Sequence, residues 1–222
     1  MATYALIHGA GDIGWYWHLV EAELRKRGHE AISMDLPVED DSAGLLEYAQ
    51  VVVSAIGDRR DPLVVAQSFG CYVAPIVCDR IGASLMVLIA GMVPAPGESA
   101  EEMLANTGYR SESRSDASEI EIFYQDVPPA LAHEAMARGR RQSETPGKQP
   151  WPLAAWPEVP TRFLLCRNDQ LFPAAWLRKV VRERLGITPD EIASGHTPAL
   201  SRPLELANRL EAYRAALSAR GG

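Results

Sequence analysis

The chain has 222 residues and a formal net charge of −7 at pH 7. This length suits one domain with a sizeable core, and the acidic balance argues against nucleic acid or anionic membranes as main partners. No apolar stretch approaches the roughly 20 residues that a membrane span needs, and the N-terminus lacks the basic and apolar regions of a secretory signal. We therefore expect a cytoplasmic protein that acts on a small molecule, with its oligomeric state left open.

Short apolar runs bounded by Gly, Pro or Asp predict buried strands. A sixth strand is expected within residues 186–193, only because a strand must precede the histidine discussed below. Apolar residues at helical spacing predict helices over 45–56 and, behind Ser201 as N-cap, over 206–217. Strands that alternate with helices indicate an α/β fold with a mostly parallel sheet covered on both faces. The five clearest strands are residues 3–7, 31–34, 62–66, 84–90 and 161–166.

The most informative stretch runs from Val64 to Val77. Its first half is β-branched and predicts a strand, its second half predicts a helix, and Ser68 lies between them in the motif Ala-x-Ser-x-Gly that begins at Ala66. A serine at such a turn exposes its hydroxyl above the sheet, and the first N–H groups of the helix point toward what it attacks. Ser68 is therefore a candidate nucleophile.

Residues 91–160 interrupt the alternation of strands and helices. The segment is rich in charge and Pro, and it is too long for a simple connection in a compact domain. Helices are expected around 101–106 and 129–138. We expect a packed cap over Ser68 with an apolar inner face, and a partly disordered surface insertion is the alternative. The apolar residues that favour the cap are Met103, Leu104, Phe123, Tyr124, Leu131, Met136, Trp151 and Trp156.

Two further residues follow predicted strands and complete a catalytic pattern. Asp169 comes after the strand 161–166, and His196 follows the weak sixth strand. The carboxyl ends of parallel strands meet at one edge of the sheet, where such folds carry their sites. A histidine can remove the proton of Ser68 and return it to a leaving group, while an aspartate fixes the imidazole tautomer. The order Ser, Asp, His along the chain predicts a nucleophile, an acid and a base.

These motifs identify a resemblance. The chain resembles the α/β-hydrolases over nearly its whole length, and within them the small-lid esterases that include plant methylesterases and hydroxynitrile lyases. The resemblance rests on His8-Gly9-Ala10-Gly11, on the Ser68 turn, on the five residues that begin at Asp169, and on Gly195-His196. One departure is Ala66, where the turn usually carries glycine; alanine is still small enough for it.

The resemblance implies the remaining parts of the site. The backbone N–H groups of Ala10 and Phe69 would form the oxyanion hole, and His8 would brace its loop rather than act as a second base. Residues 1–90 and 161–222 would form the core and 91–160 the cap. Many relatives have eight strands, and we expect six here.

The resulting hypothesis is a serine hydrolase that cleaves a small to medium, largely apolar carboxylic ester through an acyl-enzyme, without cofactor or metal. Lactone, thioester or carbon–carbon bond hydrolysis stays open, as does a ligand-binding protein without turnover. Hydroxynitrile lyases carry lysine after the histidine, where this chain has Thr197, and haloalkane dehalogenases carry aspartate in place of Ser68, so both are disfavoured. The cysteines Cys71, Cys78 and Cys166 lie in apolar stretches without metal-ligand spacing and are expected to be packing residues.

A competing interpretation comes from residues 9–14, which match the dinucleotide pattern G-x-G-x-x-G, with Asp35 further along the chain. Three features oppose it. The helix opens with the bulky residues Trp15, Tyr16 and Trp17, no tyrosine has a lysine four residues on, and the pattern leaves Ser68, Asp169 and His196 without a role. Binding of NAD(P) is therefore the least favoured hypothesis.

Overall fold

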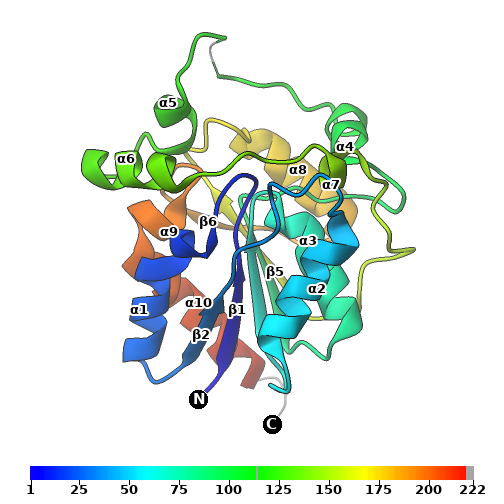
Figure 1. The fold of residues 1–222 in the computed structure, drawn as a ribbon, viewed down its shortest axis with the longest axis vertical. Coiled ribbons are helices and arrows are strands. Elements are labelled where there is room, and N and C mark those ends of the chain that lie inside the picture. Colours follow the sequence, from blue (N-terminus) through cyan, green and yellow to red (C-terminus); the bar gives the residue numbers. More distant parts are fainter. Residues whose placement is uncertain (114, 219–222) are drawn as a thin grey trace.

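A computed structural model describes residues 1–113 and 115–218 (Figure 1). Within these residues, a six-stranded parallel sheet has the order β2-β1-β3-β4-β5-β6. The predicted fold class and strand number are confirmed. The strands are β1 (Thr3–Ile7), β2 (Glu30–Ser33), β3 (Leu63–Gln67), β4 (Leu85–Ile89), β5 (Thr161–Cys166) and β6 (Asp190–Ile192).

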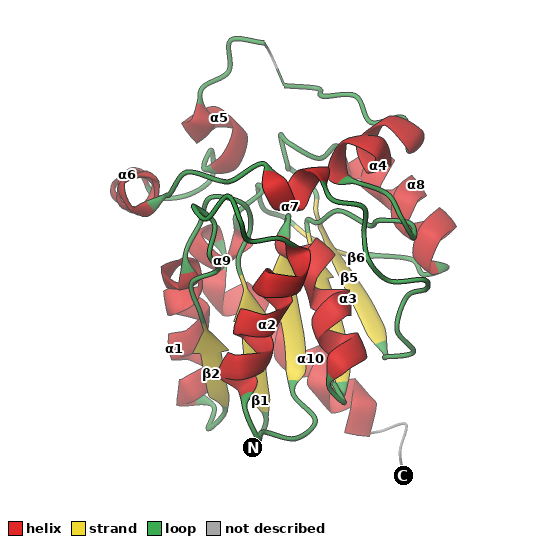
Figure 2. Cartoon of the chain, turned by 45° about the vertical axis from the view of Figure 1, so that its right-hand side comes forward, coloured by secondary structure: helices red, strands yellow, loops and turns green. Residues whose placement is uncertain are grey.

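The strands divide their side chains between two hydrophobic clusters. Ala5 and Ile7 belong to one cluster, whereas Tyr4 and Leu6 belong to the other, because successive strand residues face opposite sides. Burial on both sides explains why these strands read as continuous apolar runs. Figure 2 shows the sheet between its helical layers. One face packs against α2 (Leu45–Ile56), α3 (Gly70–Arg80) and α8 (Ala174–Leu185), the other against η1 (Gly14–Trp17), α1 (His18–Lys26), α9 (Pro198–Ser201) and α10 (Pro203–Ser218).

The predicted helix boundaries hold at α2 but not at the last helix. Ser201 ends α9 instead of capping α10, and its Oγ atom is buried with no hydrogen-bond partner in the described part of the chain. The proposed N-cap role of Ser201 is therefore wrong. None of the helices in 1–113 and 115–218 is long and apolar enough to cross a membrane.

Residues 91–160 form four short helices beyond the carboxyl ends of the strands, at the top of Figure 1. Two of them begin with capping boxes, in which Ser99 pairs with Glu102 and Ser118 pairs with Glu121. The helices around 101–106 and 129–138 were expected, and the other two were not. In chain order the helices are α4 (Ala100–Asn106), α5 (Glu119–Phe123), α6 (Pro129–Arg138) and α7 (Thr145–Lys148).

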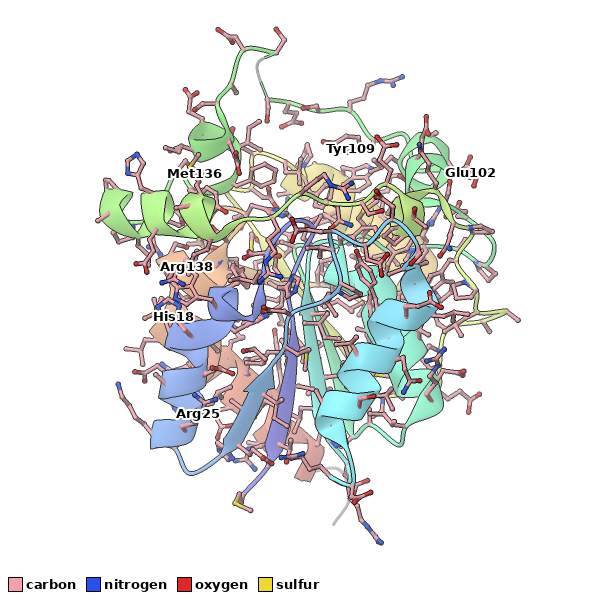
Figure 3. All side chains as sticks on the ribbon, in the orientation of Figure 1. His18, Arg25, Glu102, Tyr109, Met136 and Arg138 are labelled. Atoms are coloured by element: carbon pink, nitrogen blue, oxygen red, sulfur yellow. The ribbon has the colours of Figure 1, made fainter. Side chains whose placement is uncertain are left out.

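Two aromatic residues contribute contacts between this segment and the rest of the chain. The buried Trp151 indole donates to the Tyr72 carbonyl at 3.0 Å. The guanidinium of Arg138 lies 4.6 Å from the ring centre of Trp15, and that ring stacks on His18 at 4.3 Å (Figure 3). Such contacts stabilise by cation–π attraction and burial, so the segment is anchored to the rest of the chain at Arg138 and Trp151.

His8 braces the loop after β1, as the sequence predicts. Its ring is fully buried, with Nδ1 2.8 Å from the Gly9 carbonyl oxygen and Nε2 3.1 Å from the Leu36 nitrogen. Because Leu36 N–H donates to Nε2, the ring must be neutral, with its proton on Nδ1. Burial lowers the pKa of His8 to about 4, although Gly9 and Asp35 favour the protonated form.

This geometry predicts a pH-dependent stability. Between about pH 6.5 and 4 the unfolded chain binds a proton at His8 that the folded chain does not, so acidification destabilises the fold by up to about 1.4 kcal/mol per pH unit. Replacing His8 with Asn should remove this component, although the variant is less stable at pH 7.5. Urea unfolding of both proteins across this range measures it, and equal pH slopes would contradict the assignment.

Candidate active site

Ser68 lies on the sharp turn between β3 and α3. Its φ of 52° is in the left-handed region, where non-glycine residues are strained. A Cβ atom on Gly70 would lie 2.6 Å from the His8 carbonyl oxygen, and one on Gly9 would lie 3.0 Å from the Ser68 Cβ. Only glycine fits at these two positions, and the close approach brings the loop after β1 against the serine.

His196 and Asp169 meet Ser68 at the carboxyl edge of the sheet. His196 Nε2 lies 3.0 Å from Ser68 Oγ, and His196 Nδ1 lies 2.8 Å from Asp169 Oδ2. The other carboxylate oxygen of Asp169 accepts the N–H groups of Leu171 and Phe172 at 2.8 and 3.1 Å. The structure therefore brings together the three residues that the sequence analysis selected, in one hydrogen-bonded chain.

Neighbouring groups fix the imidazole of His196, which is only 3% exposed. The rings of Phe123 and Phe172 contact it edge to face at centroid distances of 5.5 and 5.6 Å. At the end of β3, Gln67 Nε2 donates to the His196 carbonyl at 3.0 Å. The sequence analysis missed Gln67, and its position next to Ser68 was the only available signal.

Phe69 directly follows the serine, and Ala10 lines the same cavity as the serine. Within the described residues, neither backbone N–H donates to another protein group, and Phe69 stands at the N-terminal end of α3, where the helix dipole favours negative charge. The loop that carries Ala10 is held from the inserted segment, because Gly11 N–H donates to Gln142 Oε1 at 2.9 Å and Arg140 N–H donates to the Gly11 carbonyl at 2.7 Å.

A cavity of about 420 Å³ opens onto Ser68 and His196. Its apolar surface comes from Phe123, Tyr124, Met136 and Leu171, and its polar surface includes Asp12, Glu119 and Arg140. Of the eight apolar residues that the sequence analysis assigned to the cap, only Phe123, Tyr124 and Met136 line this cavity.

Trp151 and Trp156, named among the residues that favour a packed cap, do not line this cavity. Trp151 packs in the core against Tyr72, and the Trp156 indole donates to the Pro94 carbonyl at 3.0 Å. Both rings close the base of the inserted segment. Hydrophobicity indicated correctly that these residues pack, but it carries no information about the direction of packing.

Asp12 gives the cavity an adaptable polar group. Burial raises the pKa of its carboxyl to about 7, with a smaller contribution from nearby Asp35, while the Ile13 N–H that it accepts at 2.8 Å acts in the opposite direction. Near neutral pH this carboxyl is therefore present in both protonation states. It can accept or donate a hydrogen bond to a bound molecule.

Cys71 lies one turn beyond Ser68 but is no competing nucleophile. Its thiol is fully buried, and burial raises the pKa of Cys71 to about 12, as it does for Cys78. Since the thiolate is the reactive form, these groups are inert near neutral pH. Cys166 is also buried and unpaired. The prediction that the cysteines are packing residues is confirmed.

The dinucleotide pattern has a structural explanation. The Asp35 carboxylate accepts the Gly14 N–H at 2.8 Å and pairs with Arg140 at 3.2 Å, so it is already engaged. The sheet order also differs from the 3-2-1-4-5-6 order of dinucleotide-binding domains. Across 1–113 and 115–218, no group of three or more His, Cys, Asp or Glu side chains is arranged to hold a metal ion.

Comparison with known proteins shows which family the chain matches. A model described as alpha/beta hydrolase family matches residues 5–209. Methylesterase 18 of Arabidopsis thaliana is 29% identical over 119 residues, which make up 46% of this chain and 44% of that protein. The aligned stretch thus spans less than half of that relative.

Two solved structures share the fold. An extracellular alpha/beta-hydrolase from a Paenibacillus species superposes with a TM-score of 0.79 at 18% identity, over 95% of this chain and 98% of that one. Polyneuridine aldehyde esterase superposes with a TM-score of 0.79 at 18% identity, over 96% and 99%. Since one neighbour is extracellular, a cytoplasmic location stays a prediction. The resemblance to plant methylesterases that the motifs indicated is confirmed, and the chain belongs to the alpha/beta hydrolase family.

Proposed function

We propose that this protein is a serine hydrolase that cleaves a small to medium, largely apolar carboxylic ester. The observation that carries the proposal is the chain of hydrogen bonds from Ser68 Oγ to His196 Nε2 and from His196 Nδ1 to Asp169, at 3.0 and 2.8 Å, on the wall of a cavity. This order of contacts is what nucleophilic catalysis by a serine needs.

Acylation would begin when Ser68 Oγ attacks the ester carbonyl carbon while His196 Nε2 takes the hydroxyl proton. The carbonyl oxygen becomes an oxyanion, which the N–H groups of Ala10 and Phe69 would stabilise. Asp169 would stabilise the imidazolium that forms. Collapse of the tetrahedral intermediate breaks the ester bond, and His196 returns its proton to the departing alkoxide, which leaves as an alcohol.

Deacylation would repeat these steps with water. His196 Nε2 takes a proton from the water as its oxygen attacks the acyl carbon, and the same two N–H groups would hold the second oxyanion. The bond from the acyl carbon to Ser68 Oγ then breaks, and the proton on His196 returns to the serine. The products are a carboxylic acid and the free enzyme.

In this proposal, residues 91–160 form a cap over a core of residues 1–90 and 161–222; residues 114 and 219–222 lie outside the described part. Phe123, Tyr124 and Met136 of this segment face the cavity, which supports selection of apolar groups. The names of the relatives, a methylesterase and an esterase, favour ester bonds. Lactones, thioesters and activated carbon–carbon bonds are alternative substrates to assay beside esters. In each, attack of Ser68 Oγ on a carbonyl carbon would give an acyl group bound to the serine.

Replacing Ser68 with Ala tests the nucleophile. The variant should fold normally and lose hydrolysis of p-nitrophenyl butyrate by about three decades or more, because no group can form the acyl-enzyme. A serine-directed fluorophosphonate should label the parent and the control Ser54→Ala, whose side chain is exposed on α2, but not Ser68→Ala. Full activity of the Ser68 variant would refute the proposal.

Replacing Asp169 with Asn tests the acid. The amide cannot stabilise the imidazolium and favours the wrong tautomer, so kcat should fall by about three to four decades with little change in the melting temperature. Asp79→Asn, an exposed substitution on α3, should keep the parent rate. An unchanged rate in the Asp169 variant would show that His196 relies on another group.

A series of p-nitrophenyl esters from acetate to hexanoate tests the cavity. Burial of each methylene against its apolar wall contributes about 0.8 kcal/mol, close to fourfold in kcat/KM, until the space is full. Met136→Ala should move the optimum to longer chains, because Met136 lines the cavity (Figure 3). Leu131→Ala, on the same helix but packed against the core, should not. If kcat/KM does not change with acyl chain length in any of the three proteins, residues 91–160 do not select the substrate by its chain length.

A further inference from the structure

The segment of residues 123–126, which ends α5 and follows it, contacts both loops that carry the proposed acid and base. Thr197 Oγ1 donates to the Phe123 carbonyl at 2.7 Å, and Gln125 Nε2 donates to the Asn168 carbonyl at 2.6 Å. Thr197 directly follows His196, and Asn168 directly precedes Asp169. The inserted segment is therefore bonded to the immediate neighbours of both residues.

Asp126 contacts the backbone of Gly195, directly before His196. Its Oδ2 atom accepts the Gly195 N–H at 2.9 Å, next to His196, and its side chain is only 17% exposed. The guanidinium of Arg202 lies 3.9 Å from the same oxygen. A Cβ atom on Gly195 would stand 2.7 Å from Asp126 Oδ1, so glycine is what lets the carboxylate reach the backbone.

Contacts outside the inserted segment also hold the two loops, among them the Arg167 N–H on the Ile192 carbonyl at 2.9 Å and the N–H groups of Leu171 and Phe172 on Asp169. Asn168 N–H donates to the Ser194 carbonyl at 3.0 Å and links the loops to each other, and Gln67 holds the His196 carbonyl from the sheet. Without Asp126, the Gly195 N–H would lose its acceptor, and the backbone directly before His196 could shift, while Gln67 and Asp169 would still contact His196 itself. A shift of about 1 Å in a reacting group can cost on the order of 100-fold in rate.

We propose that Asp126 is a positioning residue, whose carboxylate holds the backbone of Gly195 so that His196 stays within hydrogen-bond distance of Ser68. The role rests on the proposed function of the Ser68 site. It means that the inserted segment takes part in forming the catalytic geometry as well as covering the cavity. Asp126 touches neither the substrate nor the reacting atoms, so it acts only through His196.

Two substitutions of Asp126 test its role. Asp126→Ala should lower kcat for p-nitrophenyl butyrate by about 10- to 100-fold with KM within about threefold, since the base is misplaced while the cavity is kept. Asp126→Asn should stay within about threefold of the parent, because its amide oxygen still accepts the Gly195 N–H. Equal loss in both variants would overturn the hydrogen-bond role, as would a parent-like kcat in Asp126→Ala.

Glu102→Ala is the matched control. Glu102 is also a carboxylate of the inserted segment that accepts a backbone N–H, from Ser99 at 2.9 Å, but it lies on α4, across the segment from Met136 (Figure 3). Its loss should lower the melting temperature through the capping box and leave kcat unchanged. If Asp126→Ala does not fold, Asp126→Ser, whose hydroxyl is one bond too short to reach the Gly195 N–H, should lower kcat in the same way, and a parent-like kcat there would overturn the proposal.

A proton NMR measurement separates this inference from the proposed function. The imidazole proton between His196 Nδ1 and Asp169 should give a downfield signal in the parent, in Asp126→Asn and in Glu102→Ala, and a shifted or broadened signal in Asp126→Ala. If the parent hydrolyses no ester, the proposed function fails while this signal still reports the effect of Asp126. An unchanged signal together with unchanged kcat in Asp126→Ala would overturn the inference alone.

Discussion

The site depends on the close packing of the β3–α3 turn against the loop after β1. Ser68 adopts a left-handed φ of 52°, a conformation that costs on the order of 1–3 kcal/mol and persists only where surrounding contacts enforce it. Its N–H donates to the Ile89 carbonyl at 3.0 Å, and Gly70 passes the His8 carbonyl where no side chain could fit. Neutral His8 in turn holds the loop that carries Ala10. A single packed contact thus orients both the hydroxyl and one of the N–H groups proposed to receive the oxyanion.

The parallel sheet brings the remaining parts to the same place. The loops after β1, β3, β5 and β6 all leave from one edge, and each supplies one part of the site, although they are far apart in the chain. The inserted segment then bonds to three of these loops, through Gln142 at Gly11, Gln125 at Asn168 and Asp126 at Gly195. Its hydrogen bonds link loops that the sheet only brings near one another.

Much of this arrangement could be predicted from the sequence, and the features that the sequence did not predict were missed for physical reasons. Five strands were predicted to within one residue at each end, and for the central strands β1, β3, β4 and β5 the reason is that burial on both faces produces continuous apolar runs. The edge strand β6 contains Asp190 and Glu191 and gives almost no such signal. The helix α5 was missed, although Ser118 and Glu121 form the capping box that marks its start. The position of Ser68 on a strand-to-helix turn could be predicted from the local sequence. The proposed role of Asp126 depends on Gly195, 69 positions away, and no local pattern encodes that contact.

The charges on the sheet edges, which weaken the sequence signal, also protect the molecule from unwanted association. An edge strand exposes unpaired N–H and C=O groups to strand addition by another chain, and charged side chains and short length oppose this. At one edge β6 spans three residues, and Glu191 pairs with Arg178 at 2.7 Å. At the other edge Glu30 begins β2 and pairs with Arg59 at 2.8 Å. Both edges therefore carry features that oppose edge-to-edge pairing between copies of the folded protein.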